Sequence, residues 1–244
     1  MNTAMKSSPS QPVSFESVTP RVSCLCVTHL KPHMLERAIA CFKEQTYPNK
    51  QLVVVYEEAD SLTCKFMAAL PASSEIKPVQ IPAAASKVVL GQLRNVSVRE
   101  ADGEFVCQWD DDDWYDPERI AAQIDCLRQA EKEACVLSRW IVYDACRNKA
   151  YLSHRRLWEG SILCRRQVML DHPYDALEKG EDTSVINYLR GSNSLAVMED
   201  MPELYVYTFH GTNTWESSHF DEIFRAGSEL PEEYVSQIKK LLSV

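Results

Sequence analysis

Hydrophobic positions in the first half of the chain follow two alternating periods. Short apolar runs rich in β-branched residues indicate buried strands, and between them apolar residues recur every three or four positions, as in helices with one buried face. This pattern predicts strands at residues 21–30, 51–56, 76–81 and 104–109, and helices at residues 31–47, 62–70 and 86–103. Strictly alternating strands and helices favour a largely parallel sheet with helices on both faces.

The ends of the predicted helices carry recognisable signals. Pro48 should end the first helix, while Ser86 should cap the third and Gly103 should stop it. A fourth helix is expected after the aspartate cluster, with Asp116 as its N-cap and Pro117 at its first helical position.

The second half of the chain has a less regular pattern. Two antiparallel strands are expected at residues 134–145 and 149–156, and a short helix at residues 180–191, which Gly191 can end. Two further strands (195–199 and 203–210) precede an amphipathic C-terminal helix. The predicted fold is therefore α/β, with a mostly parallel central sheet and a smaller antiparallel region.

The boundaries of the folded unit follow from composition. Residues 1–20 are rich in Ser, Pro and Thr, which is typical of a flexible leader. Residues 21–244 contain neither an internal repeat nor a low-complexity linker, so we expect one domain with halves at 21–115 and 116–244.

Charge and cysteine usage limit the functions to consider. A net charge of -9 argues against a nucleic-acid partner, which would need a basic face, but a metal ion can still bridge the chain to a nucleotide. No apolar run approaches the ~20 residues of a membrane span, and the first residues lack the apolar stretch of a secretory signal. Nine cysteines without a C-x-x-C pair indicate buried reduced thiols in a cytoplasmic protein.

Four consecutive aspartates, residues 110–113, follow the predicted strand at residues 104–109. Adjacent carboxylates repel one another, and a divalent cation such as Mg²⁺ or Mn²⁺ removes that conflict. Ligands of parallel sheets gather at this end of the strands. In an extended segment Asp110 and Asp112 would share one side, and Asp111 and Asp113 the other. The pattern alone also fits nucleotidyl transfer, phosphoryl transfer, a structural Ca²⁺ site or a solvated acidic turn.

A series of short motifs between residues 21 and 190 resembles glycosyltransferase family 2. In chain order they are "QTYP", "RN", "ADGEFV", "DDDDWYDPERI" and "GED". The resemblance implies a GT-A fold, which is Rossmann-like, and an inverting, hexosyltransferase-type reaction with Mn²⁺ or Mg²⁺. The donor would be a nucleotide-diphosphate sugar, with a UDP-sugar favoured, and the acceptor a hydroxyl of a saccharide or glycolipid, in polysaccharide or glycoconjugate synthesis.

The same resemblance assigns roles to individual residues. Asp182 would be the general base, although a carboxylate there could also be an early-helix residue that the helix dipole favours. Asp112 would ligate the metal, and the donor would contact Thr28, Glu57 or Glu58, Arg94, Asp110 and Asp111. The family more often has Asp-Asp where this chain has Glu57 and Glu58, which leaves the donor base open.

Candidates in the second half are less sharply defined. His210 ends the predicted strand at residues 203–210 and could complete the metal site, because imidazole binds Mn²⁺; the alternative is a histidine held by one hydrogen bond. Trp158 could stack on an acceptor sugar or belong to the core. Further acceptor-side candidates are Glu181, Asn213 and Trp215.

Two other functions remain open from the sequence. A nucleotidyltransferase would share the α/β fold and the aspartates, but it commonly has a Gly-rich phosphate loop, and this chain has seven glycines and no such loop after its first strand. A non-catalytic nucleotide- or carbohydrate-binding module of the same fold is the other. The C-terminal helix favours packing or a homodimer over strong membrane attachment, and leaves open a transient contact with a lipid-linked acceptor.

Overall fold

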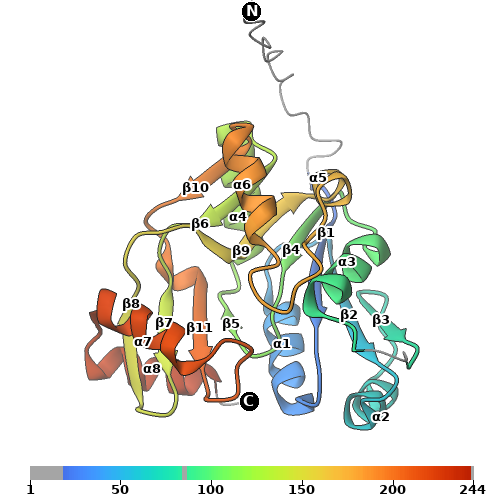
Figure 1. Cartoon of the computed structure of the whole chain (residues 1–244), viewed down its shortest axis with the longest axis horizontal. Helices are drawn as coiled ribbons and strands as arrows, with labels where there is room; N and C mark the ends of the chain where they lie inside the picture. The colour runs from blue at the N-terminus through green and yellow to red at the C-terminus, as the bar shows by residue number, and fades with distance from the viewer. Residues whose placement is uncertain (1–18, 84–86, 243–244) are drawn as a thin grey trace, which may run out of the picture.

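The computed structural model describes residues 19–83 and 87–242, which excludes most of the expected leader. Its central sheet has seven strands in the order β10-β6-β9-β4-β1-β2-β3 (Figure 1). All neighbours pair in parallel except β9, which is antiparallel to both β4 and β6. The expected mostly parallel sheet is therefore confirmed. The strands are β1 (Val22–Val27), β2 (Lys50–Glu57), β3 (Ile76–Ile81), β4 (Phe105–Gln108), β6 (Ala134–Leu137), β9 (Trp158–Arg165) and β10 (Leu195–Met198).

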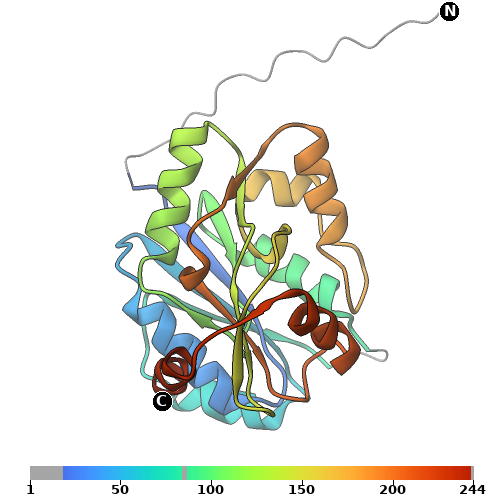
Figure 2. The same cartoon turned by 90° about the vertical axis from the view of Figure 1, so that its left-hand side faces the viewer.

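Helices cover both faces of this sheet. Successive strand residues point to opposite sides, so each face carries apolar side chains that a helix can bury. Cys24 of β1 lies in a buried cluster with Phe42 and Ile124, whereas its neighbour Leu25 lies in a second cluster with Leu93. Figure 2 shows α1 (blue) and α4 (yellow-green) on one side and α3 (green) and α6 (orange) on the other. The helices are α1 (Pro32–Glu44), α2 (Ser61–Ala69), α3 (Leu90–Glu100), α4 (Arg119–Ala130), α5 (Arg166–Asp171) and α6 (Thr183–Gly191).

A second sheet of five strands has the order β12-β8-β7-β11-β5. Its pairs are antiparallel except for β7 and β11, which run in parallel, so the expected antiparallel region is mixed. The elements in and next to this second sheet are β5 (Trp114–Tyr115), β7 (Ile141–Asp144), β8 (Lys149–Leu152), the 3₁₀ helix η1 (Pro202–Leu204), β11 (Tyr205–Phe209), α7 (Ser217–Ala226), β12 (Ser228–Glu229) and α8 (Glu232–Leu242).

The described residues include no helix long and apolar enough to cross a membrane.

Helices α7 and α8 lie beside this second sheet (Figure 1). Phe220 of α7 and Ile238 of α8 belong to the same buried cluster as Val142 of β7. Burying an apolar side chain of this size stabilises the fold by about 1.5–3 kcal/mol. The C-terminal helix therefore packs on its own chain through one face.

Several element ends differ from the sequence expectation. α4 begins at Arg119 and not at Pro117, and the Asp116 carboxylate accepts a hydrogen bond from the Glu118 amide (2.9 Å) in the turn that precedes the helix. α3 covers Leu90–Glu100, and the expected cap Ser86 lies outside the described residues. The chain is already extended at Ala101, so Gly103 does not stop the helix.

Gly103 has a different role, at a close approach of two chain segments. An added Cβ there would lie 2.6 Å from the carbonyl oxygen of Phe105 and 2.8 Å from that of Arg21. Only glycine leaves β1 and the start of β4 this close together.

The aspartate cluster connects the two sheets. It follows β4 of the central sheet and precedes β5 of the second, and β5 pairs with β11 through Tyr115 and Tyr205. This pairing brings the end of β11, and His210 after it, to the aspartates almost a hundred residues earlier in the chain.

Candidate active site

A pocket of about 760 Å³ opens at the carboxyl ends of β1, β2 and β4. Its size suits a small-molecule ligand. Most of the side chains proposed from the sequence line it: Thr28, Glu57, Arg94, Asp110, Asp111, Asp112, Trp158, Glu181, Asp182, Asn213 and Trp215.

Two proposed residues lie elsewhere. Glu58 is exposed outside the lining, and its carboxylate accepts a hydrogen bond from the Ala83 amide (3.2 Å). Of the two glutamates, only Glu57 therefore faces the pocket. His210 is not part of the lining either, but it reaches the site through its contact with Asp112.

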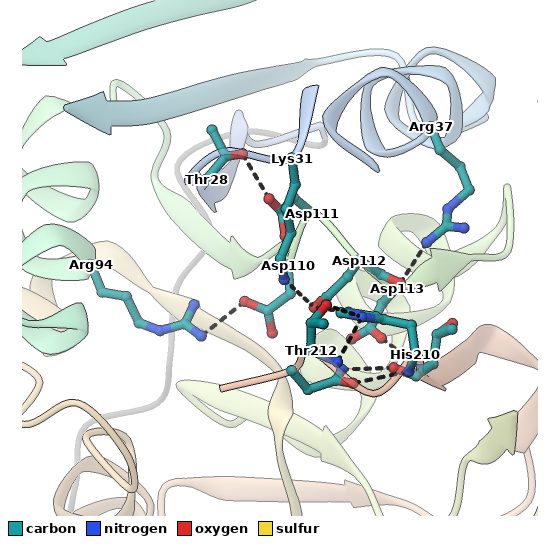
Figure 3. Close-up of polar contacts among 12 residues, drawn as sticks. Thr28, Lys31, Arg37, Arg94, Asp110, Asp111, Asp112, Asp113, His210 and Thr212 are labelled. Carbon is teal, nitrogen blue, oxygen red and sulfur yellow. Dashed lines mark hydrogen bonds and ion pairs between the residues drawn. The ribbon is translucent and has the colours of Figure 1, made fainter. Parts of the chain in front are cut away.

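The four aspartates point in different directions, as Figure 3 shows. Asp111 accepts a hydrogen bond from the Thr28 hydroxyl (2.7 Å), and Asp113 is buried against Tyr205 and the Thr208 amide (2.9 Å). Asp110 and Asp112 line the pocket together with Asp111. The expected two-and-two alternation is therefore wrong, because residues 110–113 form a turn and not an extended strand.

Asp112 is the charged centre of this cluster. Its Oδ2 atom lies 3.0 Å from His210 Nε2 and 3.2 Å from Lys31 Nζ. Burial opposes its charge, but His210 and Lys31 outweigh burial and lower the pKa of Asp112 to about 2. The pKa of Asp111 is instead raised to about 7 by burial and by the charge of Asp112.

The donor set at Asp112 fits a manganese or magnesium ion. A carboxylate and an imidazole are both ligands that Mn²⁺ accepts, and Thr212 holds the far ring nitrogen of His210 through its hydroxyl (Oγ1–Nδ1 2.9 Å). No group of three or more His, Cys, Asp or Glu side chains placed to hold a metal is found in residues 19–83 and 87–242. Any remaining ligands would therefore have to come from outside these side chains, such as water or a bound ligand.

Arg94 joins the two halves of the pocket. Its Nε donates to Glu181 (2.7 Å) and its guanidinium also donates to Asp110 (2.8 Å). Burial opposes the charge of Arg94, but these two carboxylates outweigh burial and raise its pKa well above its usual value. Glu181 is thus a buried, neutralised ion-pair partner and not a free acid.

Asp182 has a different environment from its neighbour. It precedes α6 but does not cap that helix through its side chain, and no other residue in the described part of the chain donates a hydrogen bond to its carboxylate. Burial and the charge of Glu181 raise its pKa to about 7. Asp182 is therefore a carboxylate in the pocket that is free to accept a proton near neutral pH.

Trp158 and Trp215, the two tryptophans proposed for the acceptor side, differ in how much of the side chain is exposed. Trp158 is 8% exposed and stacks on Trp140, with ring centroids 4.6 Å apart, so one of its faces is covered. Trp215 is 37% exposed and stacks on His219 (4.6 Å) at the rim of the pocket. Of the two tryptophans, Trp215 has more surface available to a ligand.

Several lining residues were not expected from the sequence. Lys31 comes directly after the turn that ends β1, a position that a search of the strand ends could have found. First-half residues such as His29, Lys87 and Gln108 line the pocket as well, and the irregular second half adds residues that carry no local signal, among them Arg156, Glu159, Gly160, Tyr207 and His219.

Two solved glycosyltransferase structures share this fold. Residues 1–349 of TarS from S. aureus, solved with UDP-GlcNAc, align at 15% identity and a TM-score of 0.62 over 89% of this chain and 70% of that one. The mannosyltransferase PcManGT from Pyrobaculum calidifontis, solved with GDP-Man and Mn²⁺, aligns at 15% identity and a TM-score of 0.58 over 93% of this chain and 69% of that one. At such identities the likeness concerns the fold, and no curated protein matches the sequence.

The fold is thus that of the GT-A glycosyltransferases. The sequence model described as glycosyl transferase family 2 matches residues 23–187, which include the aspartate turn, Arg94 and Asp182. The chain belongs to glycosyl transferase family 2.

Proposed function

We propose that the protein is a metal-dependent, inverting glycosyltransferase that moves a hexosyl group from a nucleotide-diphosphate sugar to an acceptor hydroxyl. The observation that carries this proposal is the free carboxylate of Asp182, which lines the same pocket as Asp112. The same pocket thus contains a carboxylate that can take up a proton and another that could hold a metal for the departing diphosphate.

The acceptor hydroxyl attacks the anomeric carbon from the side opposite the phosphate, which inverts the configuration. As the new carbon–oxygen bond forms, Asp182 takes the hydroxyl proton; its pKa of about 7 is matched to neutral pH. The bond between the anomeric carbon and the phosphate oxygen breaks, and the nucleoside diphosphate leaves with the electron pair. Arg94 holds Glu181 away from this exchange by pairing with it.

On the donor side, Glu57 and Thr28 line the part of the pocket beside β1 and β2, where the nucleoside would lie. A UDP-sugar is the favoured donor, and the TarS structure with UDP-GlcNAc shows that this fold can bind one. Asp112 and His210 would hold the divalent metal, which supplies positive charge to the departing diphosphate. Asp110, which accepts a hydrogen bond from Arg94 (2.8 Å), would approach the ribose.

On the acceptor side, Trp215 and Asn213 line the mouth of the pocket. The flat apolar face of Trp215 suits a pyranose ring, so a saccharide or the sugar of a glycolipid is the proposed acceptor. Because Trp158 is only 8% exposed and stacks on Trp140, it is better suited to shaping the pocket than to stacking on a sugar.

The proposal is tested by assaying transfer from UDP-, GDP- and dTDP-sugars with Mn²⁺ or with EDTA. Asp182→Asn should keep donor binding and lower turnover by roughly 10²-fold or more, the scale of a lost general base. Asp112→Asn should lose metal-dependent turnover, and Asp116→Asn, outside the pocket lining, is the matched control. Donor binding by calorimetry without any transfer or hydrolysis in the wild type would instead support the non-catalytic module.

A further inference from the structure

Lys31 contacts the same carboxylate oxygen that a metal ion would need. Its ammonium nitrogen lies 3.2 Å from Asp112 Oδ2, and His210 Nε2 lies 3.0 Å from that same atom (Figure 3). The Lys31 side chain lines the pocket and is 24% exposed, so it can be reached by a ligand. A cation that belongs to the chain thus already contacts the carboxylate oxygen that we propose as a metal ligand.

The backbone holds Lys31 in this place. Leu30 before it has a positive φ of 56°, which is uncommon outside glycine, and its amide donates to the buried Asp60 carboxylate (2.6 Å). The Lys31 carbonyl accepts hydrogen bonds from Met34 and Leu35 in the first turn of α1. The fixed backbone leaves the four-carbon side chain as the part that can move.

Three of the other acids that line the pocket already have a partner within the chain. Asp110 and Glu181 share Arg94, and Asp111 is hydrogen-bonded to Thr28. Asp112 is instead paired with the ammonium group of Lys31. An approaching divalent cation would be repelled by that ammonium group at short range.

We propose that Lys31 is a resident counter-cation that keeps the divalent metal off Asp112 and His210 until a diphosphate arrives, and then moves from Asp112 to a phosphate oxygen. The inference rests on the proposed function, because it concerns the metal and diphosphate of that reaction. It adds an order of binding: the diphosphate draws the ammonium group of Lys31 away from Asp112, and the metal binds after that. Metal and diphosphate therefore favour each other's binding, and Lys31 carries part of that coupling.

The test uses Lys31→Met in the full-length chain. Lys43→Met is the matched control, because it removes the same charge from an exposed position near the end of α1, the helix that Lys31 precedes. Binding of Mn²⁺ alone is measured from the electron paramagnetic resonance of the free ion, and binding of inorganic pyrophosphate is measured in EDTA by calorimetry. Neither readout depends on turnover or on the identity of the donor base.

Lys31→Met should bind Mn²⁺ on the order of tenfold more tightly than the wild type, because a repelling charge is gone. It should bind pyrophosphate roughly tenfold more weakly, because a charge-assisted hydrogen bond is lost. Damage to the fold would weaken both ligands, so opposite changes exclude it. The gain in Mn²⁺ affinity should disappear in the Lys31→Met/Asp112→Asn double variant, which places the metal at Asp112.

An unchanged or weaker Mn²⁺ affinity in Lys31→Met would overturn the proposal, as would equal changes in the Lys43→Met control. Unchanged pyrophosphate binding would overturn the transfer of the ammonium group to phosphate. A wild-type protein that transfers no sugar from any nucleotide sugar would overturn the proposed function. The Mn²⁺ and pyrophosphate measurements do not depend on sugar transfer, so they distinguish that failure from a failure of the Lys31 proposal.

Discussion

Replacing Asp182 by asparagine should stabilise the folded protein at pH 8 while removing glycosyl transfer. Burial and the charge of Glu181 raise the pKa of Asp182 from 3.8 to about 7. The folded protein therefore binds this proton more tightly than the unfolded chain does. The stability associated with that proton is fully present below pH 3.8 and is lost as the pH rises through 7.

The magnitude follows from the size of this shift. Each pKa unit corresponds to about 1.4 kcal/mol, so a rise from 3.8 to about 7 costs at most about 4 kcal/mol once Asp182 is charged. Water in the pocket screens part of this cost, and we expect Asp182→Asn to gain about 2–4 kcal/mol above pH 7. At pH 5 the gain should be less than half as large, because most of the wild-type carboxyl is then protonated in the folded state.

The assay is urea unfolding of the wild type and the variant at pH 5 and pH 8. Glu181→Gln is the matched control, since the same chemical change one residue earlier deprives the buried Arg94 of a partner and should destabilise by roughly 3 kcal/mol. The reasoning is refuted if Asp182→Asn is no more stable than the wild type at pH 8, or if its gain is the same at both pH values.

Three other outcomes are expected. Below pH 7 the kcat/KM of the wild type should fall about tenfold per pH unit as Asp182 takes up a proton, and a flat pH–rate profile would place the base elsewhere. His210→Ala should weaken Mn²⁺ binding in the presence of UDP by roughly tenfold or more, and an unchanged Mn²⁺ titration would remove it from the metal site. Gly103→Ala should destabilise by about 1–3 kcal/mol, because its methyl group meets the Phe105 carbonyl, whereas Gly191→Ala, with open space around it in α6, should stabilise by roughly 0.5–1 kcal/mol. Equal melting temperatures for these two glycine variants would contradict that comparison.

The first half of the fold could be predicted because its signals are local. The strands from β1 to β4 have apolar runs and are separated by helices with their own periodicity, so a parallel strand–helix alternation can be predicted even though β4 lies beside β1 and not beside β3. β9 was missed because it enters the central sheet antiparallel from the second half, between β4 and β6, and nothing near Trp158 or Arg165 indicates those distant partners.

The candidate site likewise has a part that could be predicted from local sequence and a part that could not. The aspartate cluster and the "GED" motif are contiguous and could be found in the sequence. Which acid of that motif is free could not be predicted, because the answer depends on Arg94, 87 residues away from Glu181. The contact of Asp112 with His210, across 98 residues, depends on the pairing of β5 with β11 and likewise has no local signal.

The central claim is that one pocket holds a nucleotide sugar with its diphosphate at Asp112 and His210 and its anomeric carbon facing Asp182. A crystal structure with Mn²⁺ and a non-hydrolysable UDP-sugar, with data collected at the manganese absorption edge, tests this directly. We expect an anomalous peak in contact with Asp112, His210 and the diphosphate, and the sugar between that peak and Asp182. Manganese bound elsewhere, or a sugar on the far side of the diphosphate from Asp182, would contradict the account.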